Sequence, residues 1–213
     1  MSGAFPPITE ARLEGWALCW LDLEATAEGD QALRDLVSAE AAAARGRWPG
    51  GIPVEHPTVA ALRRLFRAAG TDPTRYRPSS EALLRRVLKG EEPPAIHPLV
   101  DLNNLLSLRL LVPCCVIDPE QVAPPFVLRA GTAGEQMESL RGPFPLEGKP
   151  LLADAQGPFG TPITDSERVK VRPGTGRVWL VTYLPAGGSA EGEPAAILAD
   201  LLARAPVARL LAS

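Results

Sequence analysis

The chain has 213 residues, 46% of them hydrophobic, and a formal net charge of −3. This composition excludes an intrinsically disordered protein, and a domain of this size needs neither disulfides nor a metal to stabilise its core. Its three cysteines lack the paired spacing of a zinc site and favour reduced thiols. Met1–Glu10 lacks the basic and apolar regions of a signal peptide, and no apolar stretch approaches the ~20 residues of a membrane span. We therefore expect a cytoplasmic protein with no metal, no cofactor and no membrane association.

The first half of the chain is predicted to be mainly helical after one strand. Leu13–Leu23 is predicted as the strand because large apolar residues alternate there with smaller or polar ones. Helices are expected to follow at residues 31–45, 57–70, 79–90 and 99–110. Pro57 suits a first helical position, and Ser79 or Ser80 can cap the helix that begins there.

After Pro113 the sequence changes to short β-rich runs separated by Gly and Pro. Strands are expected at residues 115–117, 126–129, 151–154, 169–172 and 178–183, and a final helix at residues 194–203 after a flexible loop at Gly187–Gly192. This order predicts an α+β fold, a single domain with a β-sandwich-like mixed sheet core flanked by helices. The isolated strand at Leu13–Leu23 needs partners from the second half, which favours one domain over two.

One segment of this acidic chain is strongly basic. Residues 56–89 contain eight Arg or Lys residues against two acidic ones, a local charge of +6. Arg63, Arg64 and Arg67 fall on the helix face opposite its apolar residues. Such a stripe favours a polyanionic partner that docks on one side. The alternative is a pair of surface helices whose arginines are solvated.

Two adjacent pairs of residues are candidates for a site. Asn103-Asn104 lies inside an otherwise apolar helix, where a buried amide needs hydrogen-bond partners. The pair is either one packing Asn beside one exposed Asn, or two amides that line a pocket. Cys114-Cys115 follows Pro113, and its thiols are either structural and buried, or divided between the core and a cleft.

A Gly-rich run is the third candidate. Gly157–Gly160 leads into Asp165-Ser166-Glu167, and such a run supplies backbone N–H groups and hydroxyls suited to an anion or an oxyanion. The same residue types also make ordinary turns. The sequence has no Gly-x-Ser-x-Gly elbow, Walker loop or GxGxxG motif, which disfavours a conventional serine hydrolase and nucleotide-dependent chemistry.

Several dispersed motifs resemble one known family. Val100-Asp101-Leu102-Asn103-Asn104-Leu105, followed by Pro113-Cys114-Cys115-Val116-Ile117-Asp118, resembles the Val-Asp-Val-Thr-Asn-Tyr…Pro-Met-His-Ala-Phe-Asp signature. That signature belongs to the B3/B4 editing domain in the β subunit of bacterial phenylalanyl-tRNA synthetase. Gly134-Glu135 and Ser166-Glu167 resemble further motifs of that domain in the same order. The likeness covers about Val54–Pro185, and Asp165–Arg168 matches the Asp-Ser-Glu-Arg of stand-alone family members.

The resemblance implies the fold, the activity and the partner of that domain. Residues 1–53 would be an N-terminal strand and helix that pack on the core, 54–186 the B3/B4-like domain, and 187–213 a C-terminal loop and helix. In the family, the domain hydrolyses tyrosine mistakenly esterified to the phenylalanine tRNA, since a pocket alone rejects a near-isostere too weakly. The implied reaction needs tRNA as a partner and no metal, and no aminoacylation activity is expected.

The resemblance also implies a set of site residues. Catalytic roles fall on Asn104, Ser166 and Glu167. Substrate contacts fall on Asn103, Pro113, Cys115, Gly157, Gly160, Asp165 and Val181. Contacts with tRNA are assigned from the basic stripe, to Arg63, Arg64, Arg67, Arg77, Arg85 and Arg86. Cys115 replaces a pocket histidine of the synthetases, and Val181 or Thr182 replaces the glutamate that reads the tyrosine hydroxyl, so tyrosine specificity is not expected to be kept.

Three hypotheses remain open from the sequence. The leading one is a trans-acting aminoacyl-tRNA deacylase, or a relative that still binds tRNA. The second is a non-enzymatic module that binds an amino-acid-like ligand in the same pocket, because the changes at Cys115 and Val181 leave little obvious chemistry. The third is a scaffold with a vestigial pocket. The first two require the amides at 103 and 104 and the Asp165–Glu167 loop to converge on one cleft.

Overall fold

A four-stranded antiparallel sheet forms the centre of the computed structural model, which describes residues 5–26 and 28–213. Its strand order is β10 (Ala208–Ala212), β2 (Trp16–Ala25), β9 (Arg177–Pro185) and β3 (Cys114–Ile117). β2 pairs with β9 from Trp16 opposite Pro185 to Glu24 opposite Arg177. The expectation that the N-terminal strand finds partners in the second half is therefore confirmed.

A second sheet packs against one face of this central sheet. Its order is β1 (Thr9–Ala11), β4 (Phe126–Ala130), β7 (Pro150–Asp154) and β8 (Gly157–Gly160), with β1 parallel to β4 and the other pairs antiparallel. Phe126 of this sheet lies 6.0 Å from Trp20 and 6.2 Å from Trp179 of the central sheet, measured between ring centroids. A small hairpin, β5 (Gln136–Ser139) and β6 (Gly142–Pro145), extends beside it.

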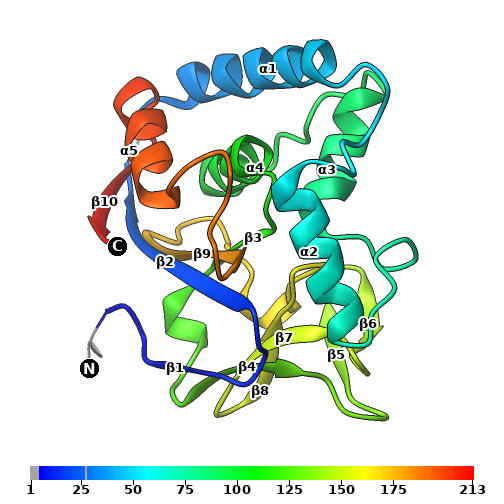
Figure 1. Cartoon of the computed structure of the whole chain (residues 1–213). Helices are drawn as coiled ribbons and strands as arrows, with labels where there is room; N and C mark the ends of the chain where they lie inside the picture. The colour runs from blue at the N-terminus through cyan, green and yellow to red at the C-terminus, as the bar shows by residue number, and fades with distance from the viewer. Residues whose placement is uncertain (1–4, 27) are drawn as a thin grey trace.

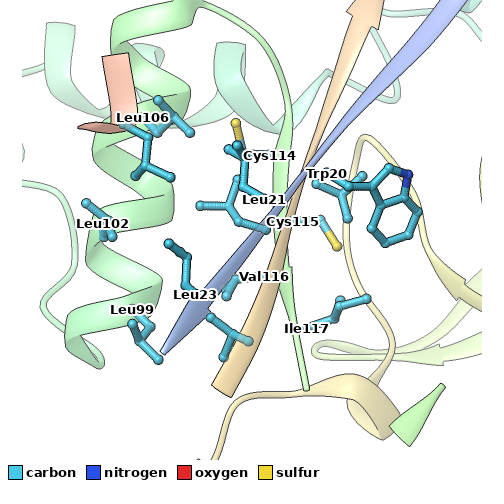
Figure 2. Packing of buried hydrophobic residues seen from close by; sticks show 14 of the residues in the cluster. Trp20, Leu21, Leu23, Leu99, Leu102, Leu106, Cys114, Cys115, Val116 and Ile117 are labelled. Carbon is cyan, nitrogen blue, oxygen red and sulfur yellow. The ribbon is translucent and has the colours of Figure 1, made fainter. Parts of the chain in front are cut away.

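Helices cover the opposite face of the central sheet (Figure 1). They are α1 (Asp30–Arg47), α2 (Pro57–Ala68), α3 (Ser79–Leu88), α4 (Pro98–Leu110) and α5 (Pro194–Arg204). Leu99, Leu102 and Leu106 of α4 face Leu21 and Leu23 of β2 in the main hydrophobic core (Figure 2). The fold is α+β in one domain, as the sequence predicted.

Several local predictions were wrong. Residues 169–172 are not a strand, because Ser166 accepts a hydrogen bond from the Arg168 N–H at 3.2 Å and starts the short 3-10 turn Glu167–Val169. Neither serine caps α3, since Pro78 is the N-cap residue and no side chain caps that end. Gly157–Gly160 forms strand β8 rather than a loop.

Short strands at both ends and between glycines were missed. These are β1, β5, β6, β8 and β10.

The loop predicted as flexible at Gly187–Gly192 is anchored by polar contacts. Ser189 Oγ donates to the Leu110 carbonyl at 2.8 Å, and Thr58 Oγ1 accepts from the Ala190 N–H at 2.9 Å.

Candidate functional site

The edge strand β3 presents its two cysteines to opposite faces of the central sheet, because successive side chains on a strand alternate. Cys114 lies on the side of α4, while Cys115 lies on the side of Trp20 and the second sheet (Figure 2). Both side chains are buried. The two thiols are therefore buried on opposite faces of this strand.

A cluster of protic side chains surrounds Cys115. A β-carbon built on Gly160 would lie 3.2 Å from the Tyr183 hydroxyl, 3.4 Å from Asp165 Oδ1 and 3.5 Å from Cys115 Sγ. Cys115 pairs with Val181, two residues before Tyr183 on β9, so Tyr183 and Val181 share a face. We call Cys115, Gly160, Asp165 and Tyr183 the Cys115 cluster. The missing side chain at Gly160 leaves the three polar groups room to approach one another.

A tight turn positions Asp165. Gly160 and Asp165 form an isolated antiparallel bridge, and the Thr161 hydroxyl accepts hydrogen bonds from the N–H groups of Ile163 and Thr164 at 3.0 and 2.9 Å. The same hydroxyl donates to the Thr164 carbonyl at 2.8 Å. Outside the turn, the Ser79 N–H at the start of α3 donates to the Pro162 carbonyl at 2.9 Å. The turn is therefore fixed from within and tied to a helix of the basic segment.

Burial sets the ionisation of the Cys115 cluster. It raises the pKa of the Asp165 carboxyl from 3.8 to about 7, an effect that the neighbouring Cys115 thiol opposes. Burial also raises the pKa of the Cys115 thiol and of the Tyr183 phenol well above their ordinary values, and Asp165 adds to both shifts. At neutral pH the cluster thus combines two protonated donors with a carboxyl group near its midpoint of titration. Asp165 Oδ1 and the Tyr183 hydroxyl are buried without a hydrogen-bond partner among the described residues.

Asn103 approaches β3 from the helical face. Its Nδ2 donates to the Cys114 carbonyl at 3.4 Å, and its Oδ1 is buried without a partner in the described part of the chain. One turn later Ser107 donates to the Val112 carbonyl at 2.7 Å. The contacts of Asn103 are therefore with the backbone of β3, whereas Asp165 lies beside Cys115 on the other face.

The remaining predicted residues are placed as follows. Asn104 is partly buried on α4, Pro113 accepts a hydrogen bond from the Tyr183 N–H at 2.9 Å, and Val181 is buried opposite Cys115. Ser166 is buried and caps the 3-10 turn, and Glu167 is ion-paired with Lys170 at 3.0 Å. Gly157 begins β8, and its carbonyl lies 3.5 Å from the Arg168 guanidinium. Pro113, Cys115, Gly160, Asp165 and Val181 are thus brought together, whereas Ser166, Glu167 and Gly157 make local contacts of their own.

The basic segment is only partly available to a partner. Arg63 forms a bidentate ion pair with the buried Glu81, at 2.9 and 2.6 Å, which joins α2 to α3. Arg77 donates to the Thr74 carbonyl at 3.4 Å, and Arg86 pairs with Glu91 at 2.9 Å. Four arginines of this segment are exposed and form no ion pair with another described residue: Arg64, Arg67, Arg75 and Arg85.

The surface pockets lie elsewhere. Four of them, with volumes of about 180 to 800 Å³, are lined by described residues, and none of these linings includes Asn103, Asn104, Cys115 or Asp165. The Cys115 cluster therefore lies outside these four pockets, with Cys115 and Tyr183 buried and Asp165 half-buried.

Tyr183 was missed as a site residue. The sequence carried a usable signal, because Tyr183 shares the strand face of Val181 and a buried phenol requires a polar partner. Its approach to Gly160, which lies 23 residues earlier in the chain, could not be inferred, because that contact depends on how the two sheets pack.

Comparison with known proteins identifies the family. The B3/4 domain model matches residues 61–190, which is more than half of the chain, so the protein belongs to the B3/4 domain family. This confirms the resemblance found in the motifs, and the matched segment contains the whole Cys115 cluster.

One solved structure with a similar arrangement is an N-terminal fragment of the phenylalanyl-tRNA synthetase β-subunit from Pyrococcus horikoshii. It is 13% identical, with a TM-score of 0.47, and the match covers 96% of this chain and 50% of that one. The present chain thus spans about half the length of this structural relative. No curated protein matches the sequence.

Two further observations concern the membrane and metals. None of the helices described here is both long enough and apolar enough to cross a membrane. Residues 5–26 and 28–213 contain no group of three or more His, Cys, Asp or Glu side chains placed to hold a metal ion.

Proposed function

We propose that the chain hydrolyses the ester bond of a misacylated tRNA in trans, with the Cys115 cluster as its reactive centre. The observation that carries the proposal is the convergence of a carboxyl, a phenol and a thiol at Gly160, within the segment that matches the B3/4 family. An aminoacyl ester is already labile. A positioned base and a hydrogen-bond donor for the oxyanion therefore suffice without a metal or a covalent intermediate.

Each member of the Cys115 cluster has a role in this reaction. The Asp165 carboxylate accepts a proton from water as the water oxygen bonds to the ester carbonyl carbon, and the Tyr183 hydroxyl donates a hydrogen bond to the oxyanion. Collapse of the tetrahedral intermediate breaks the bond to the ribose oxygen, which takes up the proton from Asp165. The Cys115 thiol stays protonated at neutral pH because its pKa is raised, so it orients Asp165 and does not act as a nucleophile. This assigns the base to Asp165 rather than to Glu167.

Access to the buried Cys115 and Tyr183 is expected to involve the turn that carries Asp165. The turn Thr161–Thr164 is bonded through Pro162 to the first residue of α3, and α3 also carries Arg85 and Arg86. A polyanion that binds α3 would therefore act on the element that holds the turn. Asn104 remains a candidate for a hydrogen bond to the aminoacyl group, since its partly buried amide has no hydrogen-bond partner among the described residues.

Three of the exposed arginines, on α2 and α3, supply the proposed tRNA contact. Arg64 and Arg67 lie on α2 and Arg85 lies on α3, and the Arg63–Glu81 ion pair holds these two helices together. Phosphate contacts of this kind carry no sequence information and weaken as salt displaces them. The proposal therefore predicts tRNA binding whose affinity falls with ionic strength.

The test is the rate of ester loss from a panel of tRNAs charged with incorrect amino acids. Asp165→Asn is expected to reduce the rate by at least roughly 10²-fold, the typical contribution of a general base. Glu167→Gln is the matched control, because Glu167 lies two residues away and its side chain is paired with Lys170. Equal loss in both variants would contradict the assignment of the base. No hydrolysis of any tRNA, together with no salt-sensitive tRNA binding, would refute the proposed function.

The burial of Cys115 and Tyr183 favours a second candidate, a B3/4 module that binds its ligand without chemistry. Asp165 Oδ1 and the Tyr183 hydroxyl would then hydrogen-bond to the amino-acid part of a ligand. The two candidates separate in one experiment. Stable binding of charged tRNA with its ester intact favours the module, and turnover favours the deacylase.

A further inference from the structure

A second polar site lies between α1 and the connection from α3 to α4, on the helical side of the molecule (Figure 1). This pocket has a volume of about 320 Å³, at the lower end of the ~300–1,000 Å³ typical of small-molecule sites. Its lining comes from α1, from the loop 92–97 and from Pro98 and Asp101 on α4. None of these residues belongs to the Cys115 cluster.

Two opposite charges face this pocket without neutralising each other. Arg34 donates through Nε and Nη2 to Gln31 Oε1 at 3.3 and 3.1 Å, and Asp101 Oδ1 accepts from the Ile96 N–H at 3.0 Å. Each charged group therefore has a neutral partner, and neither forms an ion pair within the described chain. Burial raises the pKa of the Asp101 carboxyl, an effect that its hydrogen bonds and the charge of Arg34 oppose.

His97 adds a hydrogen-bond donor to the same pocket. Its Nδ1 accepts a hydrogen bond from the Leu99 N–H at 3.3 Å, at the N-terminus of α4. A ring nitrogen that accepts carries no proton, so in the neutral imidazole the proton is on Nε2. The pocket thus combines a guanidinium and an imidazole N–H as donors with a carboxylate as acceptor.

Apolar groups form the rest of the lining. Leu33 and Pro93 are buried, and Val37 is partly buried beside them. Three acidic residues of the lining, Asp30, Glu92 and Asp101, outnumber the single arginine, which disfavours a phosphate or another simple anion. The apolar wall and Arg34 disfavour a metal cation.

We propose that this pocket binds a free α-amino acid with an apolar side chain. The ammonium group pairs with Asp101, the carboxylate pairs with Arg34 and the Nε2–H of His97, and the side chain packs on Leu33 and Val37. A zwitterion is the ligand class that satisfies both uncompensated charges at once. The site is separate from the reactive centre proposed above and requires neither tRNA nor hydrolysis.

The test is calorimetric titration of the full chain, without tRNA, with L-leucine, L-phenylalanine, leucinamide and N-acetyl-leucine. We expect both amino acids to bind. Leucinamide, which lacks the carboxylate, and N-acetyl-leucine, which lacks the ammonium group, should each bind at least roughly tenfold more weakly. Arg34→Gln should weaken leucine binding by a similar factor and leave leucinamide binding unchanged. Arg34 is exposed, so this variant should fold, and Arg204→Gln on α5 is the control that should change nothing.

Three results would overturn the proposal. They are the absence of amino-acid binding at up to ~10 mM, equal affinity for leucine and its two derivatives, or unchanged leucine binding in Arg34→Gln.

The variant Asp165→Asn distinguishes this pocket from the Cys115 cluster. Leucine binding that survives in Asp165→Asn supports a second pocket, whereas its loss would place the amino acid in the Cys115 cluster and refute this assignment.

Discussion

Removing the Asp165 carboxyl should change how the stability of the protein depends on pH. Burial raises its pKa in the folded state from 3.8 to about 7, so the folded protein holds this proton more tightly than the unfolded chain does. The favourable contribution is complete below about pH 4, falls as the pH rises, and is lost above about pH 7. The direction follows from the raised pKa, since the ionised carboxylate is the form that burial penalises.

The size of the effect follows from the same shift. The difference between 7 and 3.8 is about 3 pKa units, and each unit corresponds to about 1.4 kcal/mol, which gives a total of about 4 kcal/mol. Between pH 4 and 7, the free energy of unfolding should fall by about 1.4 kcal/mol per pH unit because of this group alone. In a chain of this length, that slope corresponds to roughly 3–6 °C in Tm per pH unit.

The assay is urea denaturation of the wild type and of Asp165→Asn at several pH values from 4 to 8. Other groups titrate in both proteins, so the relevant quantity is the difference between their free energies of unfolding. That difference should move by about 4 kcal/mol in favour of Asp165→Asn as the pH rises. Glu167→Gln, a change at a partly exposed position of the same segment, is the control, and an equal pH-dependent difference in both variants would show that the effect does not come from Asp165. Parallel curves for the wild type and Asp165→Asn would refute the buried, protonated state of Asp165.

Three further changes test other parts of the structure. Gly160→Ala adds a methyl group 3.2 Å from the Tyr183 hydroxyl, so urea denaturation should show a free energy of unfolding lower by about 1–3 kcal/mol. The rate of ester hydrolysis should fall by a larger relative amount, and an unaltered rate would contradict the close approach of these groups. Glu81→Gln removes the carboxylate that Arg63 binds through two hydrogen bonds. Because Arg63 is partly exposed, we expect the free energy of unfolding to fall by about 1–3 kcal/mol, which is below the range for a fully buried ion pair. The triple change of Arg64, Arg67 and Arg85 to Gln should weaken tRNA binding and lower the slope of log affinity against log salt by about 2–3, whereas an unchanged slope would exclude these side chains as phosphate contacts.

Much of the fold was predictable because the elements that carry it have strong local signals. Pro57 and Pro98 occupy first-turn positions of α2 and α4, and the helical spacing of the apolar residues after each proline predicts these helices correctly. The short strands lacked such a signal. β8 has two glycines in four residues, and β10 follows a helix within a few residues, so their pairing depends on partners far away in sequence.

The candidate site was only partly predictable, and the alternation of β3 explains why. The motif that contains Cys114 and Cys115 is continuous in sequence, yet adjacent strand residues face opposite sides of a sheet. Asn103 therefore comes to lie against the β3 backbone from the helical side, while Cys115 meets Asp165 on the other side. A motif that is continuous in sequence therefore does not by itself predict which of its residues share a face.

This division suggests how the two groups can still act together. Asn103 binds the Cys114 carbonyl, and the Pro113 carbonyl accepts the Tyr183 N–H, so the two residues before Cys115 are both held through their backbone. These bonds fix the end of the edge strand β3 against β9. The register of that pair decides whether Cys115 shares a face with Tyr183, because a slip of β3 by one residue would turn Cys115 to the helical face, whereas Tyr183 is held by the pairing of β9 with β2. We therefore propose that Asn103 contributes to the Cys115 cluster by positioning the strand rather than by touching a substrate.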